Sequence, residues 1–145
     1  MKALIQRVKR ASVTINGELY SSIGKGILVL LGVEKSDEIE NAQRLAQKVA
    51  NLRIFEDEND RMNFSVKDVN GEILVVSQFT LCGDCKKGTR PSFDKAAQPE
   101  KANSLYEDFV RMLKDDGFDV KTGKFRAMMD VELINDGPVT FMVEK

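Results

Sequence analysis

The sequence predicts a mixed α+β fold, an α/β chain in the broad sense, with mixed β-sheets and two main helices. In two segments, apolar residues recur at a helical spacing of about 3.6 residues. Short alternating or continuous apolar runs lie before, between and after these segments. No repeat or linker is visible, and 145 residues is a typical length for one domain. We therefore expect a single domain over residues 1–145.

The chain is expected to open with a β-hairpin and to continue into a central strand. Residues 2–8 and 12–15 have the composition of short strands, and Asn16-Gly17 supplies a turn that tolerates positive φ. Residues 26–33, GILVLLGV, form a near-continuous aliphatic run bounded by glycines. Such a run is typical of a strand buried on both faces.

The first helix is predicted to begin near Ser36, with Ser36 or Asp37 available as N-cap. Its apolar face comprises Ile39, Ala42, Leu45, Ala46, Val49 and Leu52. Strands are then expected at residues 52–57, 63–66 and 72–81. The next segment, residues 82–98, has no period and is long for a passive connection, which is typical of a functional loop.

The second helix is predicted from Pro99, a residue suited to a first helical turn, to a stop at Gly117. Its apolar face comprises Ala102, Leu105, Tyr106, Phe109 and Leu113. Strands are expected at residues 118–123, 124–134 and 139–145. Between the last two lies NDGPVT, whose Gly-Pro pair predicts a turn.

Composition excludes several kinds of chemistry. The chain has no histidine, which rules out Ser-His-Asp, Cys-His and HExxH sites. The net charge is −1, from 22 basic and 23 acidic residues, so any nucleic-acid contact must come from local clusters. The longest apolar run is far shorter than the roughly 20 residues that cross a bilayer, and the N-terminus does not resemble a signal peptide. A cytoplasmic protein is expected.

The pair Cys82 and Cys85, in CGDC, has the spacing of a redox or metal motif. Two thiols without histidine cannot complete a four-ligand zinc site within one chain, and the pair lies in a predicted loop instead of at a helix start. Incidental thiols are therefore favoured over a redox pair or a metal bridging two copies of the chain. The GKG at residues 24–26 lacks the third glycine of a dinucleotide fingerprint and predicts a turn. We expect no cofactor and no metal.

Three other groups of residues are candidates for binding, each with a plainer interpretation. Ser77, Gln78 and Thr80 end an apolar strand, where they either bind a ligand or face water. Two basic clusters are also candidates, namely Lys86, Lys87 and Arg90, and Lys121, Lys124 and Arg126. Each either contacts phosphate or forms a solvated face, and the solvated face is the more frequent case. Met128 and Met129 fit core filling better than a flexible pocket.

Three stretches in this order and at this separation resemble the D-aminoacyl-tRNA deacylase family: SQFTL at 77–81, GTRPSF at 88–93 and NDGPVT at 135–140. KALIQRV, GKGILVLLGV and MNFSV are also similar, so the resemblance covers essentially the whole chain. It implies a three-layer β/β/α fold and a cytoplasmic homodimer whose strands join across the dimer. It also implies hydrolysis of the ester that joins a D-amino acid, or glycine, to the 3′-terminal adenosine of tRNA.

The resemblance also implies roles for particular residues. Gly137-Pro138 is expected to be cis and to enter the partner subunit's active site, where its carbonyls exclude an L side chain. Ser77, Gln78, Phe79 and Thr80 are expected to shape the catalytic site, with Met129 lining the pocket and Arg7 orienting the Gly-Pro tip. Thr80 is a weak nucleophile without a paired base. The resemblance implies that the ribose 2′-hydroxyl of the tRNA assists hydrolysis instead.

Two other functions stay open. A non-catalytic tRNA- or small-RNA-binding module needs the basic loop but not the SQFTL and Gly-Pro pair. A thiol or metal protein depends on CGDC alone. Hydrolysis of D- against L-tyrosyl-tRNA distinguishes these possibilities.

Overall fold

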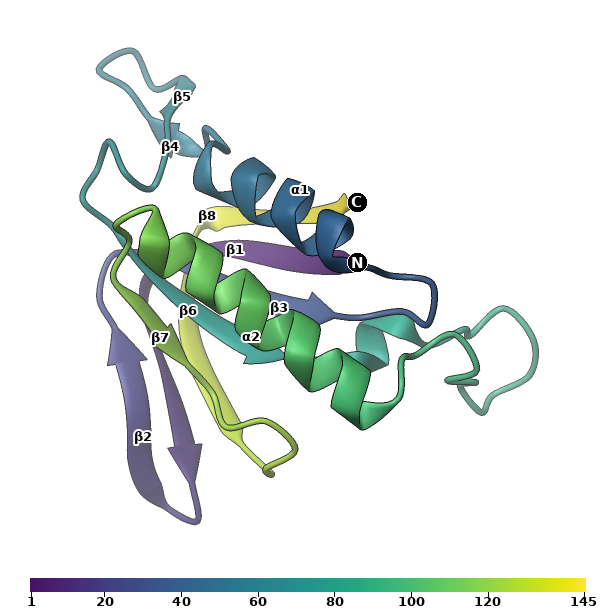
Figure 1. Cartoon of the computed structure of the whole chain (residues 1–145). Helices are drawn as coiled ribbons and strands as arrows, with labels where there is room; N and C mark the ends of the chain where they lie inside the picture. Colours follow the sequence, from purple (N-terminus) through teal and green to yellow (C-terminus); the bar gives the residue numbers. More distant parts are fainter.

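Two helices pack side by side against one face of a mixed six-stranded sheet (Figure 1). The computed structural model describes all residues from Met1 to Lys145. Its elements are β1 (Lys2–Ile15), β2 (Glu18–Ile23), β3 (Gly26–Gly32), α1 (Ile39–Ala50), β4 (Phe55–Glu56), β5 (Met62–Phe64), β6 (Glu72–Ser77), the 3₁₀ helix η1 (Phe79–Cys82), α2 (Pro99–Asp115), β7 (Val120–Thr122) and β8 (Asp130–Glu144). The predicted mixed α+β class with two main helices is confirmed. No helix has both the length and the apolar character needed to span a membrane.

The sheet has the strand order β2-β1-β3-β6-β7, and β8 pairs along the other edge of β1. β1 is antiparallel to β2, β3 and β8, whereas β3, β6 and β7 run parallel to one another. Parallel neighbours need long crossovers, and α1 and α2 lie within these two crossovers. β3 is central and buried on both faces, as its aliphatic run predicts.

β1 is one continuous strand, whereas the sequence predicts two short strands at 2–8 and 12–15. The break expected near Lys9 is an irregularity in the pairing with β8, where the register shifts between Gln6 and Val8 and again between Val8 and Arg10. An extra residue in one strand moves later side chains to the opposite face. Ala3 and Ile5 pack toward the helices, and Val8 packs on the other face by ordinary alternation. The extra residue of β1 after Val8 then places Ala11 and Val13 on the same face as Val8.

The core therefore has two parts, on the two faces of the sheet. The larger part lies between the sheet and the helices, with Leu45 of α1 and Phe109 of α2 fully buried in it. The smaller part includes Leu28 and Leu74 and is covered partly by Leu133 of β8. β2 and the first half of β8 thus form a further β layer, in agreement with the predicted β/β/α order.

Three predicted strand boundaries are wrong. β6 ends at Ser77 instead of residue 81, because η1 folds back onto β3; a Cβ at Gly32 would lie 3.1 Å from the Cβ of Leu81. Residues 124–129 form a loop that contains a turn and not the start of a strand. β8 continues through NDGPVT as one strand with a local interruption, because β1 pairs with it on both sides of that segment.

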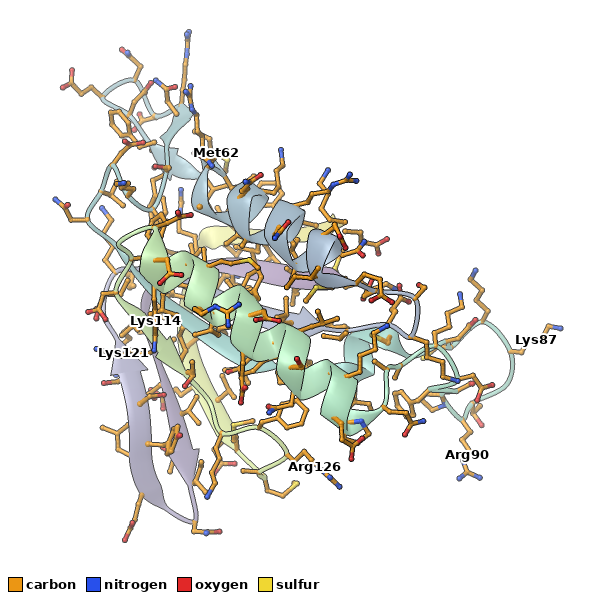
Figure 2. All side chains as sticks on the ribbon, in the orientation of Figure 1. Met62, Lys87, Arg90, Lys114, Lys121 and Arg126 are labelled. Carbon is orange, nitrogen blue, oxygen red and sulfur yellow. The ribbon has the colours of Figure 1, made fainter.

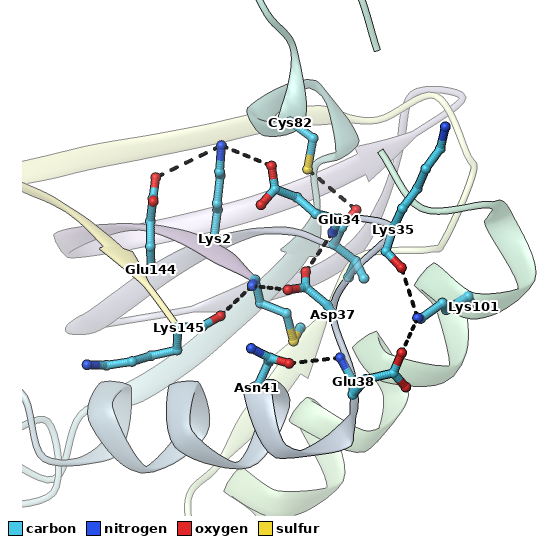
Figure 3. A network of polar contacts seen from close by, with 12 residues as sticks. Lys2, Glu34, Lys35, Asp37, Glu38, Asn41, Cys82, Lys101, Glu144 and Lys145 are labelled. Atoms are coloured by element: carbon cyan, nitrogen blue, oxygen red, sulfur yellow. Dashed lines mark hydrogen bonds and ion pairs between the residues drawn. The ribbon is translucent and has the colours of Figure 1, made fainter. Parts of the chain in front are cut away.

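The two chain ends meet beside the start of α1 (Figure 3). The N-terminal ammonium of Met1 donates to Asp37 Oδ1 at 2.6 Å and also to the carbonyl of Lys145. The other oxygen of Asp37 accepts the backbone N–H of Glu34 at 2.6 Å. Both members of the ion pair are buried. The Met1 ammonium therefore links the C-terminal residue to Asp37 in the segment before α1.

Candidate active site

A cavity of about 410 Å³ lies between the end of β6, the start of α2 and the loop that joins β7 to β8. Its walls are mostly apolar and include Phe79, Phe125 and Met129. Ser77 is its one hydroxyl-bearing residue and Arg126 its one charged residue. A mostly apolar cavity with few polar groups is the usual form of a small-molecule site.

The strand end predicted from SQFTL lies beside this cavity. Ser77 and Phe79 line it, and the ring of Phe79 packs at 5.0 Å, centroid to centroid, against Phe93 of the 82–98 loop. Gln78 is held by its backbone N–H, which donates to the carbonyl of Leu31 at 2.8 Å. Gln78 and Thr80 are next to the cavity but do not line it. The structure thus brings Ser77, Phe79 and Met129 together around one cavity, with Gln78 and Thr80 at its edge.

Thr80 is exposed and its hydroxyl oxygen accepts a hydrogen bond from the side-chain amide of Gln78. An amide N–H cannot remove a proton, so this contact does not activate Thr80 as a nucleophile. It does occupy an acceptor position of the oxygen and leaves the O–H proton free to be donated elsewhere. The geometry therefore suits Thr80 to hydrogen-bond donation.

The two neighbouring methionines differ in exposure. Met128 is 90% exposed at the cavity rim, so the expectation that it fills the core is wrong. Met129 is half-buried, packs against the smaller core cluster, and accepts the backbone N–H of Lys124 at its sulfur, 3.4 Å away. Met129 thus combines core packing with a place in the cavity wall.

Gly137-Pro138 projects from β8 at the interruption in its pairing with β1. The peptide bond between the two residues is cis, and both residues are exposed. The Asn135 side chain braces this segment: its Oδ1 accepts the N–H of Val139 at 2.9 Å, and its Nδ2 donates to Thr140 Oγ1 at 2.8 Å. The segment is therefore an exposed tip whose conformation is fixed by hydrogen bonds to the Asn135 side chain.

Arg7 of β1 is buried directly beneath this tip. Its Nε donates to the carbonyl of Asp136 at 2.9 Å, and its Nη1 donates to the carbonyl of Ile54 at 2.8 Å. Its Nη2 lies 3.4 Å from a carboxylate oxygen of Glu56. Arg7 thus links the tip to the segment after α1, a contact that agrees with the predicted orienting role without testing it.

Within one chain, the tip and the cavity are far apart. Ser77 pairs with Leu31, which pairs with Ala3, whereas the tip lies beside Arg7, four residues further along β1. Four residues along a strand span about 13 Å, and the three strand spacings from β6 to β8 add about 14 Å in the perpendicular direction. The tip of a chain therefore does not reach that chain's own cavity.

The two cysteines have different environments. Cys82 is buried and its thiol donates to the carbonyl of Val33 at 3.4 Å, whereas Cys85 is exposed. Burial raises the pKa of the Cys82 thiol, and the nearby charge of Glu34 acts in the same direction. Cys82 is thereby kept in the protonated, weakly nucleophilic form.

The predicted basic clusters are divided by the fold. Lys87 and Arg90 lie in the outer part of the 82–98 loop, away from Arg126 (Figure 2). Lys121 pairs with Asp119 at 3.0 Å. Arg126 alone lines the cavity, a position that the sequence analysis missed because it assigned residues 124–134 to a strand.

Comparisons with known proteins identify the family. The family model described as D-Tyr-tRNA(Tyr) deacylase matches residues 4–144. A D-aminoacyl-tRNA deacylase of Thermodesulfovibrio yellowstonii is 60% identical over 143 residues, covering 99% of this chain and 98% of the relative. One of Geobacillus sp. is 57% identical over 144 residues, covering 99% and 95%.

Solved structures agree with the fold. A structure named c-Myc DNA Unwinding Element Binding Protein superimposes with a TM-score of 0.95 at 45% identity, covering 100% of this chain and 99% of the other. A structure described as a "probable eukaryotic D-amino acid tRNA deacylase" has a TM-score of 0.85 at 17% identity, covering 99% and 98%, and supports the fold alone. The family match and the full-length relatives together show that this chain belongs to the D-Tyr-tRNA(Tyr) deacylase family.

Proposed function

We propose that this chain is an editing hydrolase that cleaves the ester of D-aminoacyl-tRNA to free D-amino acid and tRNA in the cytoplasm. The observation that carries the proposal is the apolar cavity beside Ser77, within a chain that matches the deacylase family over residues 4–144. The cavity, about 410 Å³, has a volume suited to a nucleoside. The polar strand end supplies hydrogen-bonding groups at its edge.

In the proposed reaction, water adds to the ester carbonyl carbon and the bond from that carbon to ribose O3′ breaks. The adjacent ribose 2′-hydroxyl assists the transfer of the proton from water to O3′. Ser77 and Thr80 donate hydrogen bonds to the ester and its oxyanion, and Gln78 holds Thr80 in place through its amide. This scheme needs no protein nucleophile, which is consistent with the absence of histidine and of any base beside Thr80.

Chiral selection is proposed to come from Gly137-Pro138 of a partner subunit. Backbone carbonyls held beside the substrate's α-carbon leave room for hydrogen but not for an L side chain. Arg7 and Asn135 fix the tip, which such a filter requires. Because glycine carries only hydrogen on both sides, glycyl esters are expected to be cleaved as well.

A homodimer is supported by β8. This strand pairs with β1 along one edge, and its other edge has no partner strand. Unpaired strand edges are usually covered by another chain or protected. Ile134, Phe141 and Met142 of β8 are 39% to 48% exposed, so a second copy would also bury apolar surface.

Purified protein is expected to release D-tyrosine from D-tyrosyl-tRNA at least about 100-fold faster than L-tyrosine from the matched L ester. The measurement is loss of ester-linked radiolabelled amino acid. A double variant, Cys82→Ser with Cys85→Ser, should retain this activity, since neither thiol takes part. Equal rates for the two esters would reject the proposal, and tRNA binding without ester loss would favour the binding module.

Replacing the terminal adenosine of the tRNA by 2′-deoxyadenosine is expected to slow hydrolysis by about 100-fold or more, because general acid–base assistance typically contributes this much. The single-turnover rate with D-tyrosine attached to the 3′-oxygen is the measurement. Binding of the uncharged deoxy-tRNA serves as control and should change little. An unaltered rate would shift nucleophile activation to the protein and reopen the role of Thr80.

A further inference from the structure

Arg126 occupies a backbone position that normally favours glycine. The N–H of Ala127 donates to the carbonyl of Lys124 at 3.1 Å, which closes a four-residue turn. Arg126, the third residue of this turn, has φ of 64°, whereas Phe125 before it is not in the positive-φ region. This is the type II pattern, in which the third residue is most often glycine. A non-glycine residue held in a disfavoured backbone conformation beside a cavity indicates a functional role.

The charge of Arg126 is not neutralised within the chain. Nine ion pairs are present, and neither Arg126 nor Lys124 of the same turn belongs to one. The side chain is exposed and extends outward from the β7–β8 loop (Figure 2). Arg126 also lines the cavity, so it is a cation outside any ion pair at the rim of a mostly apolar cavity.

The proposed substrate has one negative charge that must lie near this rim. Its terminal ribose bears the ester on O3′ and a phosphodiester on O5′, on opposite sides of the sugar. When the ester lies at Ser77 and the nucleoside fills the cavity, the phosphodiester leaves through the opening. A guanidinium binds phosphate through two parallel N–H donors.

We infer that Arg126 binds the phosphodiester that joins the 3′-terminal adenosine of the tRNA to the preceding nucleotide. The inference rests on the proposed function, since it places aminoacyl-adenosine in the cavity. Arg126 would then position the polynucleotide ester and contribute less to a nucleoside ester that has no phosphate. Lys124, on the same turn, would add a weaker, longer-range attraction.

Two substrates and two variants test this. The substrates are D-tyrosyl-tRNA and 3′-O-(D-tyrosyl)adenosine, and the variants are Arg126→Gly and Arg126→Ala. Each variant is expected to raise KM for the tRNA ester about fivefold to tenfold more than KM for the nucleoside ester. The slope of log KM against log salt concentration should fall by about 0.7 for the tRNA ester, the value for one single-strand phosphate contact.

The glycine variant guards against a folding artefact, because glycine suits φ of 64° and should not lower the melting temperature. Arg44→Ala, which removes an exposed arginine from α1, is the matched control and should alter neither KM. Equal effects of the Arg126 variants on both substrates, or no effect on either, would overturn the inference.

Binding is measured separately with 3′-(D-tyrosylamino)-3′-deoxyadenosine, an amide that cannot undergo ester hydrolysis, alone and extended at O5′ by a CpC dinucleotide. Arg126→Gly should weaken binding of the extended amide fivefold to tenfold more than that of the nucleoside amide. If wild-type protein hydrolyses neither ester, the proposed function fails. The two amides then test independently whether Arg126 binds phosphate. If Arg126→Gly weakens binding of both amides equally, the proposed phosphate contact is contradicted.

Discussion

Gly137→Ala is expected to weaken discrimination against L-aminoacyl-tRNA by about tenfold or more, because small displacements of a positioning group have large effects on reactivity. A Cβ at Gly137 would lie 2.7 Å from Val139 Cγ2 and 3.2 Å from Arg7 Nη2. Its φ of 136° is also unfavourable for an L residue. The tip must therefore move away from the groups that hold it. The measurement is the ratio of D- to L-tyrosyl-tRNA hydrolysis.

Gly117→Ala is the matched control for this variant. Gly117 also has positive φ, at 88°, but a Cβ there meets no atom within 4 Å and the residue follows α2, outside the cavity lining. It should therefore share the backbone penalty without changing chiral selectivity. Pro138→Ala, which removes the ring that restricts φ, is expected to change selectivity in the same direction as Gly137→Ala. Unchanged ratios in both tip variants would contradict the role proposed for the tip.

Asp37→Ala is expected to lower the free energy of unfolding by about 3–5 kcal/mol, the usual cost of removing one partner of a buried ion pair. The Met1 ammonium would stay buried 2.6 Å from where its carboxylate had been, and the N–H of Glu34 would lose its acceptor. At roughly 3 °C per kcal/mol for a domain of this size, the melting temperature should fall by about 10–15 °C. Thermal and urea denaturation measure the change.

Two variants separate the buried pair from ordinary surface charge. Asp37→Asn keeps an acceptor for the Glu34 N–H and should be destabilised less than Asp37→Ala. Glu34→Gln removes the partly exposed pair with Lys2, at 3.3 Å, and should cost less than about 1 kcal/mol. A loss below 1 kcal/mol for Asp37→Ala would show that the junction of the chain ends contributes little to stability.

Local patterns in the sequence were sufficient for most of the secondary structure. The second helix begins at Pro99 as predicted, the hairpin turns at Asn16-Gly17, and the aliphatic run forms the central strand β3, Gly26–Gly32. These features depend on neighbours within a few residues, namely helical spacing, turn dihedrals and a continuous apolar run. The resemblance in SQFTL and NDGPVT supplied the candidate site residues, which composition and spacing alone left open.

The errors occurred where distant segments decide the local structure. The strand predicted over 72–81 ends early because η1 packs on Gly32 of β3. The expected turn at NDGPVT lies within a single strand because β1 pairs with both sides of it. Arg126 has the alternating pattern of a strand residue in sequence, but its turn places it at the cavity. The first two contacts have no signal within a short window. The turn at Arg126 is local, but its placement beside the cavity depends on the distant β6 and α2.

The sequence by itself determined where the helices and most strands lie, and it excluded chemistry that needs histidine, because both depend on residue type and local spacing. Only the tertiary structure decided which side chains share a cavity and which lie apart. Tertiary packing brings Ser77 at the end of β6 together with Phe79 of η1 and Met129 of the β7–β8 loop, and it buries Asp37 against the N-terminus. Strand register holds Gly137-Pro138 against Arg7, at a distance from that cavity. Register is set by the packing of the whole sheet, so no short stretch of sequence specifies it.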